Sequence, residues 1–244
     1  MRLEGKTIVV TGAGSGIGRA AALCCAAEGA RVGGMDWDGE GVGETVRLIE
    51  ETGGAACGVQ VDVREGEQVR SAMEEMETAL GRIDGLIAAA GILEGILVPI
   101  DLFDESTWDR VIDVNLKGCF WAARYAVPAM ERAGGGVIVL ISSGAGVRGG
   151  SSSVAYGSSK GGVHGLSLVL AAQLEPRNVR VHAVCPGNIN TPLKMRVVEK
   201  QTSASGRPLE KARSGLGGPE GVGKILAFLV SDEADYVRGT IFTR

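Results

Sequence analysis

The fold is decided by Lys6-Thr7-Ile8-Val9-Val10 and the stretch that follows it directly, Thr11-Gly12-Ala13-Gly14-Ser15-Gly16-Ile17-Gly18. The first stretch is a short β-branched run, typical of a buried parallel strand. Residues 17–28 are rich in Ala and Leu and predict a helix. A strand, a glycine-rich turn and a helix N-terminus together form a phosphate cradle, because glycine lets the backbone approach and free N–H groups face the anion.

The alternation of strand and helix continues along the whole chain. Further strands are predicted over residues 30–36, 55–63, 83–90, 136–141, 179–185 and 240–243, and further helices over 40–52, 65–80, 105–132, 155–174 and 219–230. This order predicts an α/β fold of the Rossmann type, a single domain over residues 1–244. We expect a doubly wound parallel sheet of about seven strands with helices on both faces.

Composition excludes several classes of protein. The chain has 244 residues, 45% hydrophobic and 22% charged, which suits one domain with a full core. A net charge of −4 without a Lys/Arg block argues against nucleic acid. No apolar run reaches the ~18 residues of a membrane span and no apolar signal region begins the chain, so we expect no membrane partner and a cytoplasmic location. Five cysteines without CxxC spacing and two histidines predict no metal site.

The residue at the end of the second predicted strand bears on the choice of cofactor. Asp36 lies 18 positions after Gly18, where a carboxylate can hydrogen-bond the hydroxyls of an adenosine ribose. It would repel a 2′-phosphate, and neither Ser15 nor Trp37 offers a basic group for one. We therefore expect NAD rather than NADP. The alternative for Asp36 is a helix cap or turn residue. Asp62, after the third strand, is placed to reach the adenine amino group.

Tyr156 and Lys160 stand four residues apart in a predicted helix and so share one face. A nearby ammonium favours the phenolate and lowers the pKa of the phenol, which prepares it for proton transfer. An ordinary exposed Tyr/Lys pair is the alternative. Asn115 interrupts an apolar helical stretch, which indicates either a specific buried role or a polar group satisfied by neighbouring backbone.

Two segments are candidates for the walls of a substrate site. Residues 91–104 form an apolar loop at the carboxyl end of a strand. Residues 192–215, here called the lid segment, lack clear periodicity and hold six Lys/Arg and two acidic residues between Leu193 and Arg213. We interpret them as a lid over an anionic substrate, with a solvated surface segment as the alternative.

The motif Thr11-Gly12-xxx-Gly16-x-Gly18, with Asn115, Ser143 and Tyr156-xxx-Lys160 in this order, resembles the short-chain dehydrogenase/reductase family. Ser143 lies 13 positions before Tyr156, which matches that family and selects it over Ser142. Pro186-Gly187 followed by Thr191 is also similar. One departure is Ala88-Ala89-Ala90-Gly91, where the family usually carries Asn-Ala-Ala-Gly; it predicts some loss of stability in the central sheet.

The resemblance implies an NAD-dependent oxidoreductase that interconverts a secondary alcohol and a ketone, working as a homo-oligomer (tetramer or dimer). Tyr156 is then the general acid/base, Lys160 lowers its pKa and holds the nicotinamide ribose, Ser143 orients the substrate oxygen, and Asn115 supports a water relay. The implied cofactor-binding residues are Gly12, Ser15, Gly16, Ile17, Gly18, Asp36, Asp62, Val63, Ala89, Gly91, Tyr156, Lys160, Pro186, Gly187, Ile189 and Thr191.

Two other functions stay open from the sequence. One is a nucleotide-binding scaffold or redox sensor without turnover, which the altered Ala88 position allows and the complete catalytic set argues against. The other is a 3-oxoacyl-thioester reductase. That function fits the fold, but such enzymes often prefer NADPH, and Asp36 argues against a 2′-phosphate.

Overall fold

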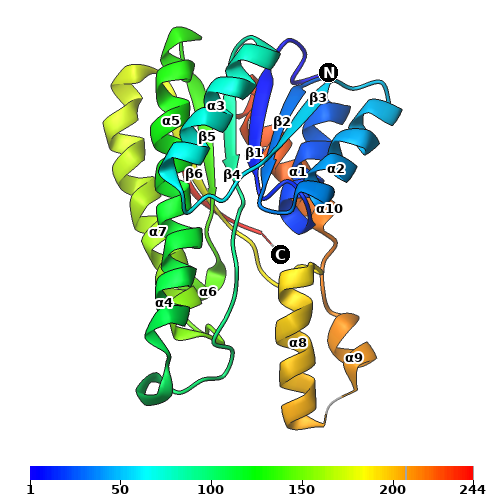
Figure 1. Cartoon of the computed structure of the whole chain (residues 1–244), viewed down its shortest axis with the longest axis vertical. Coiled ribbons are helices and arrows are strands. Elements are labelled where there is room, and N and C mark those ends of the chain that lie inside the picture. Colours follow the sequence, from blue (N-terminus) through cyan, green and yellow to red (C-terminus); the bar gives the residue numbers. More distant parts are fainter. Residues whose placement is uncertain (207, 244) are drawn as a thin grey trace.

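The computed structural model describes residues 1–206 and 208–243, and its centre is one seven-stranded parallel sheet (Figure 1). The strand order is β3-β2-β1-β4-β5-β6-β7, and every neighbouring pair is parallel. The strands are β1 (Thr7–Thr11), β2 (Arg31–Asp36), β3 (Ala56–Gln60), β4 (Gly85–Ala88), β5 (Gly136–Ile141), β6 (Val179–Cys185) and β7 (Gly239–Phe242). The predicted fold class is confirmed.

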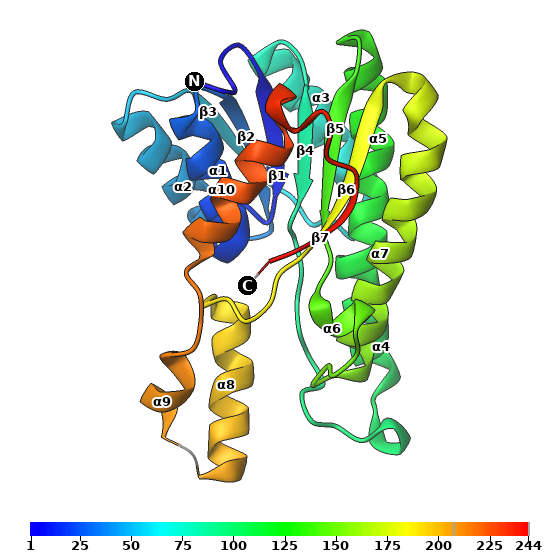
Figure 2. The same ribbon diagram turned by 180° about the vertical axis from the view of Figure 1, so that it is seen from behind.

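Helices cover both faces of the sheet (Figures 1 and 2). On one face lie α1 (Gly16–Ala27), α2 (Gly39–Glu51) and α10 (Pro219–Leu229); on the other lie α3 (Gly66–Leu80), α5 (Gly118–Arg132) and α7 (Val154–Leu174). The helix α4 (Glu105–Ile112) runs into α5 through a π-helical turn, η2 (Asp113–Lys117). The 3-10 turns are η1 (Ile100–Leu102), η3 (Glu175–Arg177) and η4 (Asp232–Ala234). In the described part of the chain, no helix combines the length and the apolar character needed to cross a membrane.

The sheet separates two hydrophobic clusters. Alternate residues of β5 show why: Ile138 and Leu140 belong to the cluster under α3, α5 and α7, whereas Val137 and Val139 belong to the cluster under α1 and α10. Successive side chains of a strand point to opposite faces, so a strand buried on both sides is apolar throughout. These two clusters hold the strand ends, and with them the site, in fixed positions.

Several elements differ from the sequence predictions. The strands β3 and β4 are shorter than expected, and the single helix predicted over 105–132 is divided by η2. A one-turn helix, α6 (Gly144–Val147), follows β5 and was not predicted. The lid segment contains two helices, α8 (Pro192–Ser205) and α9 (Leu209–Arg213); its residue 207 lies outside the described residues.

Candidate active site

The predicted site residues gather at the carboxyl edge of the sheet. The chain builds β1, β2 and β3 outward in one direction and then places β4 on the other side of β1. The connections after β1 and β4 therefore leave in opposite directions, and a crevice opens between them at this switch point. The glycine-rich turn follows β1, and Ala89-Ala90-Gly91 follows β4.

The turn after β1 fits a phosphate group. Gly12 has a φ of +72°, and a Cβ on it would lie 2.7 Å from the backbone nitrogen of Ala90. A Cβ on Gly18 would overlap the carbonyl oxygen of Gly12. Ser15 is the N-cap residue of α1, and among the described residues its side chain makes no capping hydrogen bond. The first-turn N–H groups of α1 are therefore available to an anion.

Asp36 ends β2 and faces this turn. Its Oδ2 accepts a hydrogen bond from the backbone N–H of Gly14 at 2.7 Å, and its Oδ1 accepts one from the N–H of Asp38 at 3.0 Å. The carboxylate is therefore fixed beside the cradle, at the edge where an adenosine ribose would lie. Its contact to Asp38 also agrees with the turn role that was the alternative.

Arg19 is a residue of this region that the sequence reasoning missed. Its guanidinium donates to the carbonyl oxygens of Gly14 and Gly41, and its Nε donates to Thr45 Oγ1 at 3.0 Å. Thr45 in turn donates to the carbonyl oxygen of Ala13 at 2.8 Å. Arg19 thus fastens the glycine turn to α2. The sequence feature that could have identified Arg19 is its position directly after Gly18 of the glycine-rich turn.

Asp62 and Val63 follow β3, as predicted, but their side chains have partners within the protein. The Asp62 carboxylate pairs with the guanidinium of Arg64 at 2.5 Å, and the hydrogen bonds from Arg64 lower the pKa of the carboxyl. The Val63 side chain is buried in the core. Only the backbone of Val63 could contact a ligand, and contact between Asp62 and an adenine stays a prediction.

Ser143 and Tyr156 form the centre of the candidate site. The Ser143 hydroxyl lies beside the Tyr156 phenol. Burial raises the pKa of the Tyr156 phenol above its ordinary value, and the neighbouring Ser143 hydroxyl opposes that rise. Ser143 is also the N-cap residue of α6, where its Oγ accepts from the N–H of Ala145 at 3.2 Å. The sheet edge therefore carries a hydroxyl pair that is suited to holding one substrate oxygen.

Lys160 follows Tyr156 by one turn of α7, as the sequence predicted. Its ammonium is buried and donates to the carbonyl oxygen of Ile141 at 2.7 Å, 5.9 Å from the centre of the Tyr156 ring. Burial raises the pKa of Tyr156, and the expected lowering of that pKa by Lys160 stays a prediction. Burial also lowers the pKa of Lys160 itself.

Asn115 lies in the π-helical turn and is fully buried. Its Oδ1 accepts from the N–H of Ile92 at 2.8 Å, and its Nδ2 donates to the carbonyl oxygen of Ile92 at 3.0 Å and to Ser159 Oγ at 2.9 Å. Asn115 therefore joins the loop after β4 to α7. A Cβ on Gly91 would lie 3.2 Å from Asn115 Oδ1 and 3.4 Å from Lys160 Nζ, so these two atoms flank that glycine. The water relay stays a prediction.

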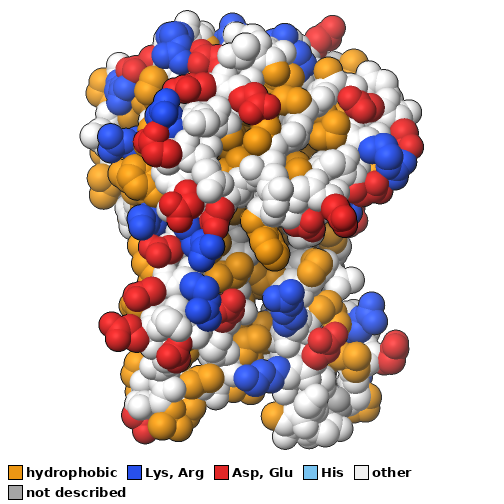
Figure 3. Space-filling view, in the orientation of Figure 1, with side chains coloured by type: hydrophobic (Ala, Val, Ile, Leu, Met, Phe, Trp, Pro, Cys, Tyr) orange, Lys and Arg blue, Asp and Glu red, His pale blue; other side chains and the backbone are white. Residues whose placement is uncertain are grey.

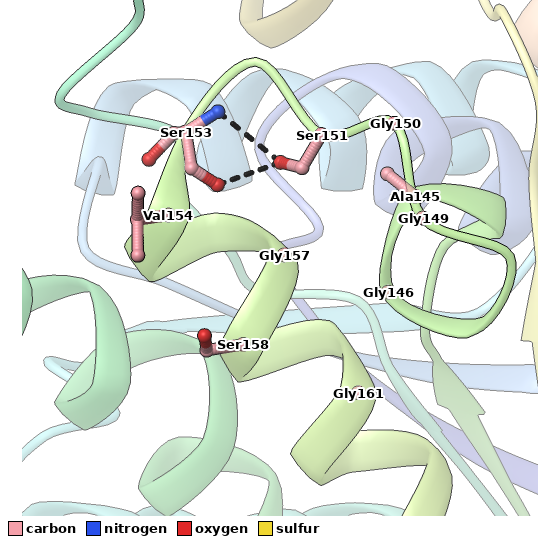
Figure 4. A pocket seen from close by; sticks show the side chains of 10 residues that line it. All are labelled: Ala145, Gly146, Gly149, Gly150, Ser151, Ser153, Val154, Gly157, Ser158 and Gly161. Carbon is pink, nitrogen blue, oxygen red and sulfur yellow. Dashed lines mark hydrogen bonds between the residues drawn. The ribbon is translucent and has the colours of Figure 1, made fainter. Parts of the chain in front are cut away.

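Glycines set the distance between Ser143 and Tyr156. Figure 4 shows Gly146 and Gly161 where the segment after β5 runs alongside α7. A Cβ on Gly146 would lie 2.5 Å from the backbone nitrogen of Gly161. The Ser142 hydroxyl adds a bond to the carbonyl oxygen of Lys160 at 2.8 Å. Because Ser142 is used there, Ser143 is the hydroxyl left for Tyr156, as the spacing predicted.

The segment after β6 closes the other side of the crevice. Thr191 is the N-cap residue of α8, and a Cβ on Gly16 would lie 3.3 Å from its Cγ2, so the lid begins against the glycine turn. Pro186 and Ile189 are buried, Gly187 is exposed, and Ile189 forms a β-bridge with Gly217. Packing of Ile189 on a nicotinamide ring stays a prediction. Figure 3 shows a hollow between the two lower lobes, one of which contains α8 and α9.

A phosphate cradle at a switch point is a dinucleotide site, and the hydroxyl pair next to it can exchange a proton with a substrate oxygen. That combination defines a dinucleotide-dependent oxidoreductase of the α/β class.

Comparison with known proteins narrows the class. The model of the short chain dehydrogenase family matches residues 6–202. A 3-oxoacyl-(acyl-carrier-protein) reductase from Thermotoga maritima is 39% identical over 243 residues, covering 99% of this chain and 96% of its own. A 3beta-hydroxysteroid dehydrogenase 1 from Eggerthella lenta is 38% identical over 240 residues, covering 98% and 91%. A short chain dehydrogenase from Mycobacterium paratuberculosis bound to NAD superposes with a TM-score of 0.89 at 29% identity, covering 100% and 97%.

The chain therefore belongs to the short-chain dehydrogenase/reductase family of oxidoreductases.

Proposed function

We propose that this protein is an NAD(H)-dependent enzyme that interconverts a secondary alcohol and a ketone. The observation that carries the proposal is that the Ser143 hydroxyl lies beside the Tyr156 phenol at the carboxyl edge of the sheet and lowers the pKa of that phenol. The cradle at Gly12 to Gly18 supports the cofactor part, because its glycines leave the space that a pyrophosphate needs and its N–H groups face that space.

The residues that would hold the cofactor divide along its length. The glycine turn would bind the pyrophosphate, Asp36 the adenosine ribose, Lys160 the nicotinamide ribose and Thr191 the carboxamide. When bound, the cofactor supplies or accepts the hydride. The protein's part is to fix the reacting carbon and to move a proton at the substrate oxygen.

In the reducing direction Tyr156 donates its phenolic proton to the carbonyl oxygen, while Ser143 donates a hydrogen bond to the same atom. In the oxidising direction Tyr156 accepts the proton of the alcohol. Burial raises the pKa of Tyr156, so the phenol is protonated at neutral pH and has a proton to donate in the reducing direction.

The test separates binding from turnover. A panel of secondary alcohols and ketones is assayed with NAD and NADH, and cofactor binding is followed by fluorescence. Tyr156→Phe is expected to bind NADH as the wild type does and to lose about 100-fold or more in turnover, the typical share of a general acid/base. Retention of most turnover would overturn the mechanism. Binding without turnover of any compound would favour the scaffold or redox-sensor alternative.

Cofactor preference is tested separately at Asp36. We expect NADH to bind more tightly than NADPH, because the 2′-phosphate would lie beside a fixed carboxylate. Asp36→Ala should reduce that difference. Tighter binding of NADPH by the wild type contradicts this part of the proposal and leaves the proton-transfer pair untouched.

A second candidate function is reduction of a 3-oxoacyl thioester. The 39% identity to a 3-oxoacyl-(acyl-carrier-protein) reductase supports it, whereas Asp36 argues against the NADPH that such enzymes often prefer. Comparing kcat/KM for acetoacetyl thioesters with kcat/KM for simple ketones of the same length decides between the two.

We also propose that the active form is a homo-oligomer. Phe120 on α5 and Leu168 and Val169 on α7 are 40%, 52% and 65% exposed, on two helices of the same layer. A second copy of this chain would cover these side chains. Light scattering should give a dimer or tetramer for the wild type and a smaller species for Val169→Glu; a monomeric wild type contradicts the proposal.

A further inference from the structure

A second cavity lies in the lid segment, between α8 and α9, with a volume of about 240 Å³. One wall is a single face of α8, formed by Lys194, Val198 and Thr202 at intervals of four residues. Ala212 on α9 and Leu216 after it line the opposite side. No member of the Asn115, Ser143, Tyr156 and Lys160 group lines this cavity, so it is separate from the candidate active site.

Of the described residues that line the cavity, Lys194 is the only one with an ionisable side chain. It is half-buried, and burial lowers the pKa of its ammonium. Among the described residues no carboxylate offsets that effect, although Glu199 and Glu210 lie on the same two helices. A partly desolvated ammonium without a counter-ion favours an anion beside it.

The other polar groups restrict the kind of anion. The hydroxyls of Thr202 and Ser205 donate to the carbonyl oxygens of Glu199 and Gln201 at 3.0 and 2.8 Å, so they offer a ligand only their lone pairs. The ammonium of Lys194 suits one anionic head group, and the side-chain amides of Asn188 and Gln201, which also line the cavity, can donate to the same group. Val198, Ala212 and Leu216 form the apolar part of the wall.

We propose that this cavity is a binding site for a small aliphatic carboxylate, whose anionic group pairs with Lys194 and whose hydrocarbon part packs against Val198, Ala212 and Leu216. The ligand joins α8 to α9 and so orders the lid segment. The base of the cavity supports this coupling: Gly217 donates to the carbonyl oxygen of Asn188 at 2.9 Å, and Asn190 donates to that of Gly217 at 2.8 Å. The backbone N–H of Lys194 donates a hydrogen bond to Thr191 Oγ1 at 3.2 Å, so the cavity adjoins the start of the lid segment.

The experiment uses butyrate as the probe, with sodium chloride holding the ionic strength constant. Butyrate binding is measured by calorimetry and hydrogen exchange is followed along the full chain. At ten times Kd, exchange in α8 and α9 should slow by about tenfold, because exchange through local opening follows ligand saturation. Acetate, which has less hydrocarbon to bury, should bind more weakly.

Four variants identify the site. Lys194→Met should abolish binding and protection, and Lys194→Arg should retain both. Lys200→Met changes an exposed lysine of α8 that does not line the cavity, so it should behave as the wild type. Ala212→Leu fills the cavity and keeps the charge, and it too should abolish binding.

The proposal is overturned if the wild type gains no protection, or if Lys194→Met or Ala212→Leu binds butyrate as well as the wild type does. Melting curves of each variant show whether a loss of butyrate binding is caused by unfolding of that variant. The readouts do not use turnover, so they succeed or fail independently of the proposed alcohol/ketone chemistry.

Discussion

Lys160 on α7 donates a hydrogen bond from Nζ to the backbone carbonyl oxygen of Ile141, the last residue of β5, at 2.7 Å. Ile141 immediately precedes Ser142 and Ser143. The buried ammonium therefore ties the helix that carries Tyr156 to the strand that carries Ser143. This contact gives Lys160 a positioning role that precedes any contact with a cofactor.

Replacing Lys160 with Met keeps the length of the side chain and removes its charge and its donor. Loss of the bond to Ile141 destabilises the fold, whereas removal of a buried charge stabilises it, so we expect the free energy of unfolding to change by less than about 2 kcal/mol. The value of kcat/KM should fall by about 100-fold or more, because the site loses a charge that positions its proton-transfer pair. Steady-state kinetics and urea unfolding measure the two effects.

The control is Lys117→Met, since Lys117 is exposed and pairs with Asp113 at 3.3 Å. It should leave kcat/KM as in the wild type. A Lys160→Met enzyme with wild-type kcat/KM would show that the contact to Ile141 has no bearing on activity.

Replacing Ser143 with Ala should move the pH profile of the enzyme to higher pH. The Ser143 hydroxyl beside Tyr156 lowers the pKa of the phenol, so its removal leaves only the effect of burial and raises that pKa further. Alcohol oxidation needs the phenolate and rises with pH through this pKa; carbonyl reduction needs the phenol and declines through it. In profiles of kcat/KM against pH, the rise for oxidation and the decline for reduction should therefore both move to higher pH. A shift to lower pH, or none, contradicts the assigned pair.

Parts of this structure follow from sequence pattern because they depend on local physics. The run of β5 is apolar, and that of β6 is apolar apart from Arg180 and His182. The two runs end just before Ser142 and Pro186, so their predicted bounds match the observed ones. Parallel strands bring their carboxyl ends to one edge, which is why Asp36 and Ser143 could be placed together in advance.

Other parts depend on contacts between distant segments and left no local signal. Lys160 reaches Ile141 only once α7 packs on the end of β5, and Asn115 faces Ile92 only once α4 and the preceding loop are packed. The helix α8 showed no apolar periodicity because Val197 and Val198 are its only buried residues among those described. The other faces of α8 border the hollow seen in Figure 3, the cavity lined by Lys194, and solvent.

Replacing Gly146 with Ala should misplace Ser143. The new methyl group would lie 2.5 Å from the nitrogen of Gly161, so α6 must move away from α7. We expect a loss of stability of roughly 1–3 kcal/mol, and a fall in kcat of up to about 100-fold from a displacement of about 1 Å.

The control is Gly144→Ala in the same helix. A Cβ on Gly144 meets no atom within 4 Å in the described structure, so activity should be unchanged. Equal effects of the two substitutions would mean that helix α6 does not set the position of Ser143 through its contact with α7.

His182 on β6 should make the fold sensitive to acid. It is fully buried, and neither ring nitrogen has a hydrogen-bond partner among the described residues. Burial, with the charges of Arg180 and Arg238 adding to it, lowers the pKa of His182 from 6.5 to about 4. As the pH falls below 6.5 the unfolded chain takes up this proton before the folded chain does. The stability contributed by neutral His182 is therefore complete above pH 6.5 and is lost between pH 6.5 and about 4, which amounts to about 3 kcal/mol.

The measurement is urea unfolding at several pH values across that window. His182→Leu removes the titrating group, so its free energy of unfolding should decline less than that of the wild type by about 2–3 kcal/mol between pH 7 and 4.5. His164→Gln alters the other histidine, which contacts Thr240 Oγ1 at 2.9 Å, and should keep the wild-type slope. If His182→Leu and the wild type lose the same free energy, other groups, chiefly carboxylates, account for the acid sensitivity, and the buried imidazole must find a partner in solution that restores its ordinary pKa.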